Sequence, residues 1–241
     1  MLSACSGSAV GAGSAVDSTF PPADAIPQEA PQIELLAQAY QGKNIVEIPQ
    51  ILSEDPTETI STINLKMLDF AGDYGTFLAV LSDDVWLELK CYLLYGADSI
   101  QIILTRAEYP LEDGYGEIAS FVYNYKEDRE CTLEEAVRTA DIDLTESENQ
   151  LLLAVPEDMT ILDFRPVAFA VTGAETTPNL FFYDVLVGGG GSEMNGGRML
   201  YIRYPDGSYE AYDGGSLSPA FPDGSLLALD PPLFWAQQAE G

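Results

Sequence analysis

The sequence predicts an α+β fold, in which a curved antiparallel β-sheet has one main helix packed on a face and a second short helix. Two segments carry helix-capping signals followed by apolar residues at helical spacing, one starting near Asp55 and one near Thr132. Between and after them, runs rich in β-branched and aromatic residues are separated by short turns, which favour hairpins over βαβ crossovers. A chain of 241 residues is long enough to bury a sizeable core.

The main helix is expected at about residues 56 to 71. Asp55 suits the N-cap, Pro56 the first helical position, and Glu58 the return hydrogen bond of a capping box. Apolar residues then recur at helical spacing, at Ile60, Ile63, Met67, Leu68 and Ala71. Gly72 is expected to end the helix.

Strand-like runs follow with the spacing of an antiparallel meander. The first group covers residues 76 to 81, 85 to 95, 99 to 109 and 116 to 125, and the second covers 161 to 172, 180 to 187 and 198 to 204. A glycine-rich loop from Gly188 to Gly197 joins the last two runs. It matches neither a P-loop nor a dinucleotide fingerprint, so no cofactor is expected there.

A short second helix is expected at about residues 132 to 140, because Thr132 and Glu135 form a capping box ahead of apolar residues. Asp141 to Glu148 is interpreted as a charged connector. It lacks the glycine and the spacing of a calcium-binding EF-hand loop, so no metal site is expected. Residues 151 to 155 fit either a helix or a strand.

Three regions are expected along the chain. Residues 1–30, rich in Gly, Ser, Ala and Pro, predict a flexible tether; residues 31–204 form the α+β domain; residues 205–241, with two Pro-Asp-Gly turns, form a tail. No segment approaches the ~20 apolar residues of a membrane-spanning helix. We therefore expect the sequence as printed to be soluble.

The first five residues, Met1 to Cys5, resemble a bacterial lipobox, in which small residues precede a cysteine that is lipidated after the signal peptide is cleaved. This resemblance implies export, a lipid on Cys5 and a place on the extracellular face of the cell membrane. The charged and apolar regions of a signal peptide are missing upstream, so we infer a truncated or mis-started chain. The alternative is a cytoplasmic protein that happens to begin with this string.

The composition narrows the function. With 39 acidic residues, 10 basic residues and no histidine, the net charge is -29, which excludes nucleic acid as a partner and attracts cationic proteins. The alternative is that the charge only keeps the domain soluble. Without histidine the usual general base and the commonest zinc ligand are missing, so we expect no catalytic residues, and no enzyme.

The cysteines and tyrosines supply the candidate site residues. If Cys5 carries lipid, an exported chain permits one disulfide between Cys91 and Cys131; the alternative is that both are buried thiols. Tyr123 and Tyr125 alternate along one strand, and Tyr92 is expected on the same face of a neighbouring strand. These tyrosines are a candidate binding surface for a glycan or a protein, and the alternative is core packing.

Three stretches in order resemble the RsiV-like extracellular domain family, found in anti-sigma factors and Gram-positive surface proteins. They are Ile45 to Asn64, with Ile48-Pro49-Gln50-Ile51 leading into a helix; Ile100 to Val137, with Tyr123-Asn124-Tyr125 and then Thr132-Leu133-Glu134-Glu135; and Phe169 to Tyr204, with Leu180-Phe181-Phe182-Tyr183. The turn after Tyr125 departs from the family pattern, so no binding residue carries over. The resemblance implies a non-catalytic domain that binds lysozyme or a cell-wall component.

Taken together, the sequence favours an exported, lipid-anchored bacterial surface protein whose domain binds a basic extracellular protein, such as lysozyme, or a cell-wall glycan. Two alternatives stay open. A carboxylate-dependent enzyme acting on glycans would need two opposed acidic side chains in a cleft. A structural envelope protein would need a large apolar patch or a symmetric assembly.

Overall fold

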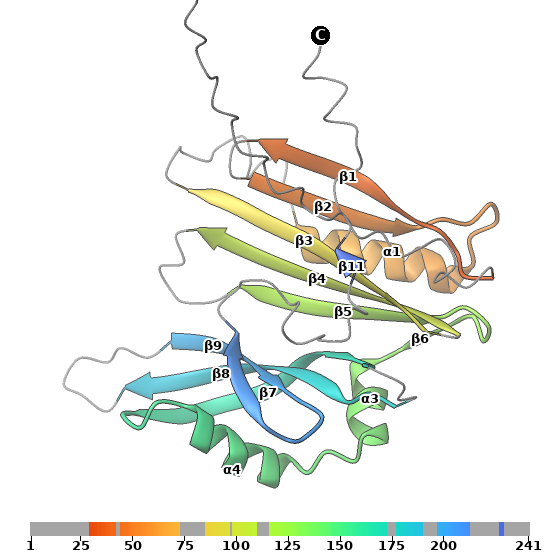
Figure 1. Ribbon diagram of the computed structural model, residues 1–241. Helices are drawn as coiled ribbons and strands as arrows, with labels where there is room; N and C mark the ends of the chain where they lie inside the picture. The colour runs from red at the N-terminus through yellow and green to blue at the C-terminus, as the bar shows by residue number, and fades with distance from the viewer. Residues whose placement is uncertain are drawn as a thin grey trace, which may run out of the picture.

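The computed structural model describes residues 29–41, 44–72, 85–96, 98–109, 116–172, 177–189, 197–212 and 227–228. Within these residues the chain forms two β-sheets and three helices, stacked in four layers (Figure 1). A helix covers the outer face of the larger sheet, the two sheets pack face to face, and two helices cover the smaller sheet. The α+β class is confirmed, but the structure has two sheets where the sequence analysis expected one.

The larger sheet, called sheet A below, runs in the order β1-β2-β3-β4-β5-β6, and β11 pairs with β3. Its strands are β1 (Ile33–Gln41), β2 (Asn44–Ile51), β3 (Trp86–Tyr95), β4 (Ser99–Tyr109), β5 (Glu117–Asn124), β6 (Arg129–Cys131) and β11 (Leu227–Ala228). All neighbours are antiparallel except β2 and β3, which are parallel and connected through α1 (Glu58–Ala71). The hairpins expected after the helix are present between β3, β4 and β5, but the sheet is not purely antiparallel, because β2-α1-β3 is a crossover unit that the sequence analysis did not expect.

The smaller sheet, sheet B, runs in the order β10-β9-β8-β7 and is antiparallel. Its strands are β7 (Met159–Ala170), β8 (Leu180–Gly189), β9 (Gly197–Arg203) and β10 (Tyr209–Tyr212). β10 lies in the segment that was expected to be a tail. Its Pro-Asp-Gly turn closes a hairpin, with Gly207 at a φ of 85° and a hydrogen bond from the Tyr204 amide to the Ser208 carbonyl at 2.9 Å.

Helix α1 begins two residues later than the sequence analysis predicted. Thr57, not Asp55, is the N-cap, and its hydroxyl accepts a hydrogen bond from the Ile60 amide at 3.2 Å. The buried side chains of α1 are Ile60, Ile63, Met67 and Ala71, which pack on sheet A. Asn64 also forms hydrogen bonds of 2.9 and 3.1 Å with the backbone of Ile51 at the end of β2.

Two helices cover the outer face of sheet B (Figure 1). The shorter, α3 (Leu133–Thr139), has the predicted capping box between Thr132 and Glu135. The longer, α4 (Leu144–Ala154), replaces most of the connector expected at residues 141 to 148. Its N-cap is Asp143, whose carboxylate accepts hydrogen bonds from the amides of the first turn. The segment predicted as a connector therefore contains the N-cap Asp143 and the first-turn residue Glu146 of α4. Carboxylates are favourable at both positions.

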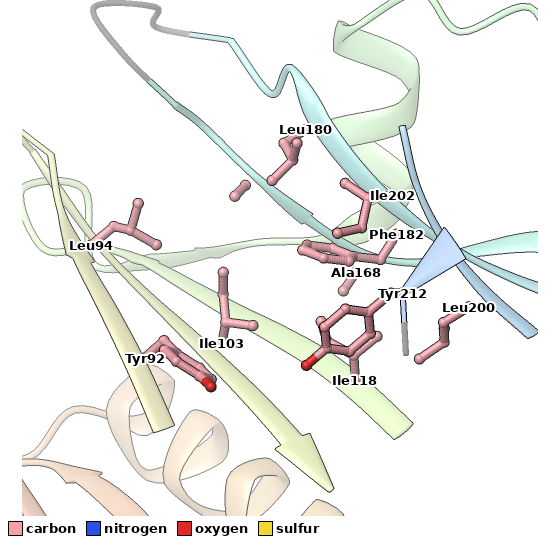
Figure 2. Close-up of a cluster of buried hydrophobic side chains, with 11 residues drawn as sticks. Tyr92, Leu94, Ile103, Ile118, Ala168, Leu180, Phe182, Leu200, Ile202 and Tyr212 are labelled. Carbon is pink, nitrogen blue, oxygen red and sulfur yellow. The ribbon is translucent and has the colours of Figure 1, made fainter. Parts of the chain in front are cut away.

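The core between the two sheets consists of aliphatic and aromatic side chains (Figure 2). Sheet A contributes Tyr92, Leu94, Ile103 and Ile118, and sheet B contributes Ala168, Ala170, Leu180, Phe182, Leu200, Ile202 and Tyr212. Polar links join the same layers. The buried Gln101 side chain accepts from the Val171 amide at 2.8 Å and donates to the Val171 carbonyl at 3.1 Å. The Ser120 hydroxyl accepts from the Phe169 amide at 3.0 Å.

Candidate binding site

The predicted tyrosine surface does not exist as one face. Tyr92 lies in the core between the sheets, whereas Tyr123 lies on the opposite face of sheet A, under α1. The register explains the error, because Tyr92 is opposite Ile103, and Ile103 is opposite Ser120 rather than Phe121. Both tyrosines are buried, so core packing is the correct interpretation for these two side chains.

Tyr123 takes part in a hydrogen-bond network that connects α1 to the turn between β5 and β6. Its hydroxyl donates to the Asp128 carboxylate at 2.9 Å, and the Thr57 hydroxyl donates to the same oxygen at 2.8 Å. The Thr59 hydroxyl donates to the Asp128 carbonyl at 3.0 Å. Burial, followed by this bond to Asp128, raises the pKa of Tyr123 to about 12. Asp128 has a φ of 49°, a conformation that Asp tolerates better than most residues.

Tyr125 is the member of the predicted surface that stays partly accessible. It is half-buried and packs against the edge of the core under α1. Its neighbour Lys126 forms an ion pair with Asp98 in the turn between β3 and β4. The arrangement closes this end of sheet A and is structural in character.

The disulfide that the sequence permits between Cys91 and Cys131 is not formed, and both cysteines are free thiols, as in the alternative. Cys91 is buried on the α1 side of sheet A, whereas Cys131 packs with the core between sheet B and its helices. Residues on opposite faces of a sheet cannot bond without moving the backbone. Burial raises the pKa of both thiols, and the carboxylate of Glu47 adds to the effect on Cys91. Cys5, the predicted lipidation site, lies outside the described residues.

The sequence analysis did not identify two buried carboxylates of the described chain, Glu47 and Asp184. Glu47, on β2, accepts a hydrogen bond from the Cys91 amide at 3.0 Å, next to the short parallel pairing of β2 and β3. Asp184, on β8, pairs with Arg165 at 3.4 Å and Arg198 at 2.5 Å, which come from the two neighbouring strands. The three residues of that group are far apart in sequence, so no local spacing could have predicted it.

A third polar group lies beneath α4. The hydroxyls of Tyr183 and Tyr209 are buried and make no hydrogen bond of good geometry, although the Tyr183 hydroxyl lies close to Ser147 and Tyr209; the two rings meet edge to face with centroids 5.5 Å apart. Ser147, on the inner face of α4, is also buried. Burial, with a contribution from Tyr209, raises the pKa of Tyr183 to about 12. The contact between α4 and sheet B is therefore partly polar.

The surface around α4 is the most one-sidedly acidic part of the described chain. Residues 139–164 hold seven acidic side chains and no basic one. They are Asp141, Asp143, Glu146, Glu148, Glu157, Asp158 and Asp163, and all seven are exposed. Among the described residues, no group of three or more potential ligands is placed to hold a metal ion.

Two carboxyl groups elsewhere have clearly displaced pKa values. A hydrogen bond from the Thr132 amide lowers the pKa of Glu135, and hydrogen bonds from Ser208 lower the pKa of Asp206. A general acid in a glycosidase needs the opposite shift. Both carboxylates are explained by local capping and turn geometry.

No described helix has the length and apolar character needed to cross a membrane. No protein-family model matches the chain. A search of curated proteins likewise gives no significant match.

Proposed function

We propose that this chain is the binding domain of an exported, lipid-anchored bacterial surface protein of the RsiV-like type, and that it binds a cationic extracellular protein without catalysing a reaction. Lysozyme is the model partner, and a basic cell-envelope component is the broader class. The lipid would be carried by Cys5. The proposal rests on charge, on the lipobox-like first residues and on the family resemblance.

The observation that carries the proposal is the distribution of the basic side chains. Within the described ranges, seven of them already form ion pairs with carboxylates of the same chain: Lys66, Lys90, Arg106, Lys126, Arg129, Arg165 and Arg198. The chain has 39 acidic and 10 basic residues, so 29 carboxylates have no basic counterpart, and the ion pairs already occupy most of the basic residues. Such a field raises the encounter rate with a basic partner.

Titration of the purified chain with lysozyme at several ionic strengths tests the binding. Because the Debye length falls from about 30 Å at 0.01 M salt to about 8 Å at 0.15 M, the association rate constant should fall as salt is added. Succinylated lysozyme, whose lysines become acidic, is the control and should not bind. Absence of binding at low salt, or equal binding of both forms, would refute the proposed partner class.

The lipid anchor needs a separate test in the native precursor. The precursor should partition into the membrane fraction and into the detergent phase of a phase separation, because the acyl chains on Cys5 dominate its partitioning. A Cys5→Ser precursor should lose both behaviours, while Cys131→Ser should keep them. Membrane association of the Cys5→Ser precursor would contradict the assignment.

A further inference from the structure

The C-terminal end of α4 exposes two neighbouring leucines. The side chain of Leu153 is 81% exposed and that of Leu152 is 49% exposed, whereas Leu151 is fully buried against sheet B. Leu151 and Val155 occupy the inner face at helical spacing and Ala154 packs beside them, whereas Leu152 and Leu153 point outward. Two exposed leucines in succession are an apolar contact surface that the fold of the described chain does not use.

Three exposed carboxylates lie within five residues of this leucine pair along the chain. Glu148 lies one turn before Leu152 on α4, and Glu157 and Asp158 follow the helix in the turn that leads to β7. The helix dipole adds partial negative charge at the same end, and the last turn of α4 contains no basic residue that would offset it. Apolar surface and negative potential therefore coincide at one place.

The exposed leucines of α1 have a different environment. Leu65 and Leu68 are 61% and 40% exposed on a helix of similar length. Lys66 lies between them and forms an ion pair with Glu130 on β6. The pair on α1 therefore serves as a control with somewhat smaller apolar exposure and weaker negative charge.

We propose that Leu152 and Leu153, with Glu148, Glu157 and Asp158, form the docking surface for a basic amphipathic segment of the partner protein. Apolar side chains of that segment contact the two leucines, and its flanking Lys or Arg residues meet the carboxylates. The inference rests on the proposed function and deepens it, because it specifies where the cationic partner binds. Charge complementarity selects this kind of occupant over a neutral apolar peptide.

Two synthetic peptides of equal charge test the role of the leucines: a Leu-Lys peptide with one apolar helical face, and an oligolysine. The double variant Leu152→Gln with Leu153→Gln should weaken binding of the Leu-Lys peptide by about tenfold, as is typical when central apolar contacts are removed. Its affinity for oligolysine should stay within about twofold. The control variant Leu65→Gln with Leu68→Gln should leave both affinities within that range.

A second pair of variants, which carry the same net charge as each other, tests the carboxylates. Glu157→Gln with Asp158→Asn removes two charges beside α4, and Glu54→Gln with Asp55→Asn removes two exposed charges before α1. The α4 variant should lower the affinity for the Leu-Lys peptide at least threefold more than the control does. It should also make that affinity less dependent on salt, because only charges close to the bound peptide attract it strongly through the screening salt. Circular dichroism melts of all variants check that folding is retained.

Three outcomes would overturn the docking surface. In the first, the leucine variants on α4 and α1 weaken binding equally. In the second, the two charge variants weaken binding equally, which would mean that the attraction comes from the whole acidic surface and not from α4. Lysozyme could also bind with an affinity that no α4 variant changes, which would leave the proposed function standing and place the contact elsewhere. If the unmodified chain binds neither lysozyme nor either peptide, the proposed function itself fails.

Discussion

The Gln101 side chain is the clearest test of how the two sheets are held together. It is only 4% exposed. Its side-chain amide donates to the Val171 carbonyl and accepts from the Val171 amide, as the backbone of a neighbouring strand would. Replacement by methionine keeps the length of the side chain and removes both hydrogen bonds. The Val171 amide and carbonyl would then lie unpaired between the sheets.

The cost of Gln101→Met can be worked from these contacts. A buried backbone group left without a partner costs about 1–3 kcal/mol, and Val171 is half-buried, so the lower part of the range applies to each group. The sum is roughly 2–4 kcal/mol, reduced by about 1 kcal/mol because an apolar side chain gains from burial at this site. We expect a net loss of about 2 kcal/mol, a large share of the roughly 5–15 kcal/mol that stabilises a domain.

Equilibrium unfolding in urea, followed by circular dichroism and tryptophan fluorescence, measures this loss. With a slope of about 2–3 kcal/mol/M, the midpoint of Gln101→Met should fall by about 0.7–1 M. Gln150→Met, on the exposed face of α4, is the matched control and should shift the midpoint little. If the two variants unfold at the same urea concentration, the Gln101 link does not stabilise the packing of the sheets.

Further predictions follow from the tyrosines, thiols and helices. Tyr123→Phe should destabilise the fold by about 1 kcal/mol because the bond to Asp128 is lost, whereas Tyr183→Phe should be neutral or stabilising because it deletes a buried hydroxyl that makes no hydrogen bond of good geometry; thermal melts with the opposite ranking would contradict the network. Tyr123 and Tyr183 have pKa values raised to about 12 from 10.0, so their contribution to stability should be constant below pH 10 and should be lost between pH 10 and 12; absorbance at alkaline pH should show them ionising later than in denaturant. With a thiol reagent, Cys131 should react before unfolding and Cys91 only with it; a bond between them in mass spectra would refute the assigned faces. In hydrogen exchange, α4 should lose protection before α1, since its contact with sheet B is partly polar.

Local signals in the sequence predicted β4 and the helices α1 and α3, but not β1, β2, β6, β10 or most of α4, and the strand expected at residues 76 to 81 lies outside the described residues. The range from Ser99 to Tyr109 matches β4 at both ends, and the capping box at Thr132 is present as expected. Helix α1 was placed correctly except for its first turn, where Asp55 and Thr57 are both acceptable N-caps in sequence. The hydroxyl contact from Thr57 to Asp128, 71 residues away, fixes the start in the fold.

Long-range pairing was not predictable from the sequence. The sequence analysis missed β1 and β2, although the sequence has the turn residues Gly42 and Asn44 at their junction. The parallel pairing of β2 with β3 has no local signature. The face occupied by Tyr123 depends on which residue of β5 lies opposite each residue of β4. A shift of one residue reverses every side chain, and the length of the intervening loop does not fix that register. The binding surface inferred from tyrosine parity failed for this reason.

The placement of the basic residues connects the fold to the proposed function. Lys66, Lys126 and Arg129 all contact carboxylates at or beside the β5–β6 turn, and Arg165 and Arg198 converge on Asp184. These cations offset repulsion where strands bring acidic side chains together. The segment 139–164 receives none of them, so self-repulsion is concentrated on the helix whose contact with sheet B is already partly polar. A cationic partner at α4 would supply the missing charge, and its binding should therefore stabilise the domain by an amount that grows with the logarithm of its concentration above the dissociation constant.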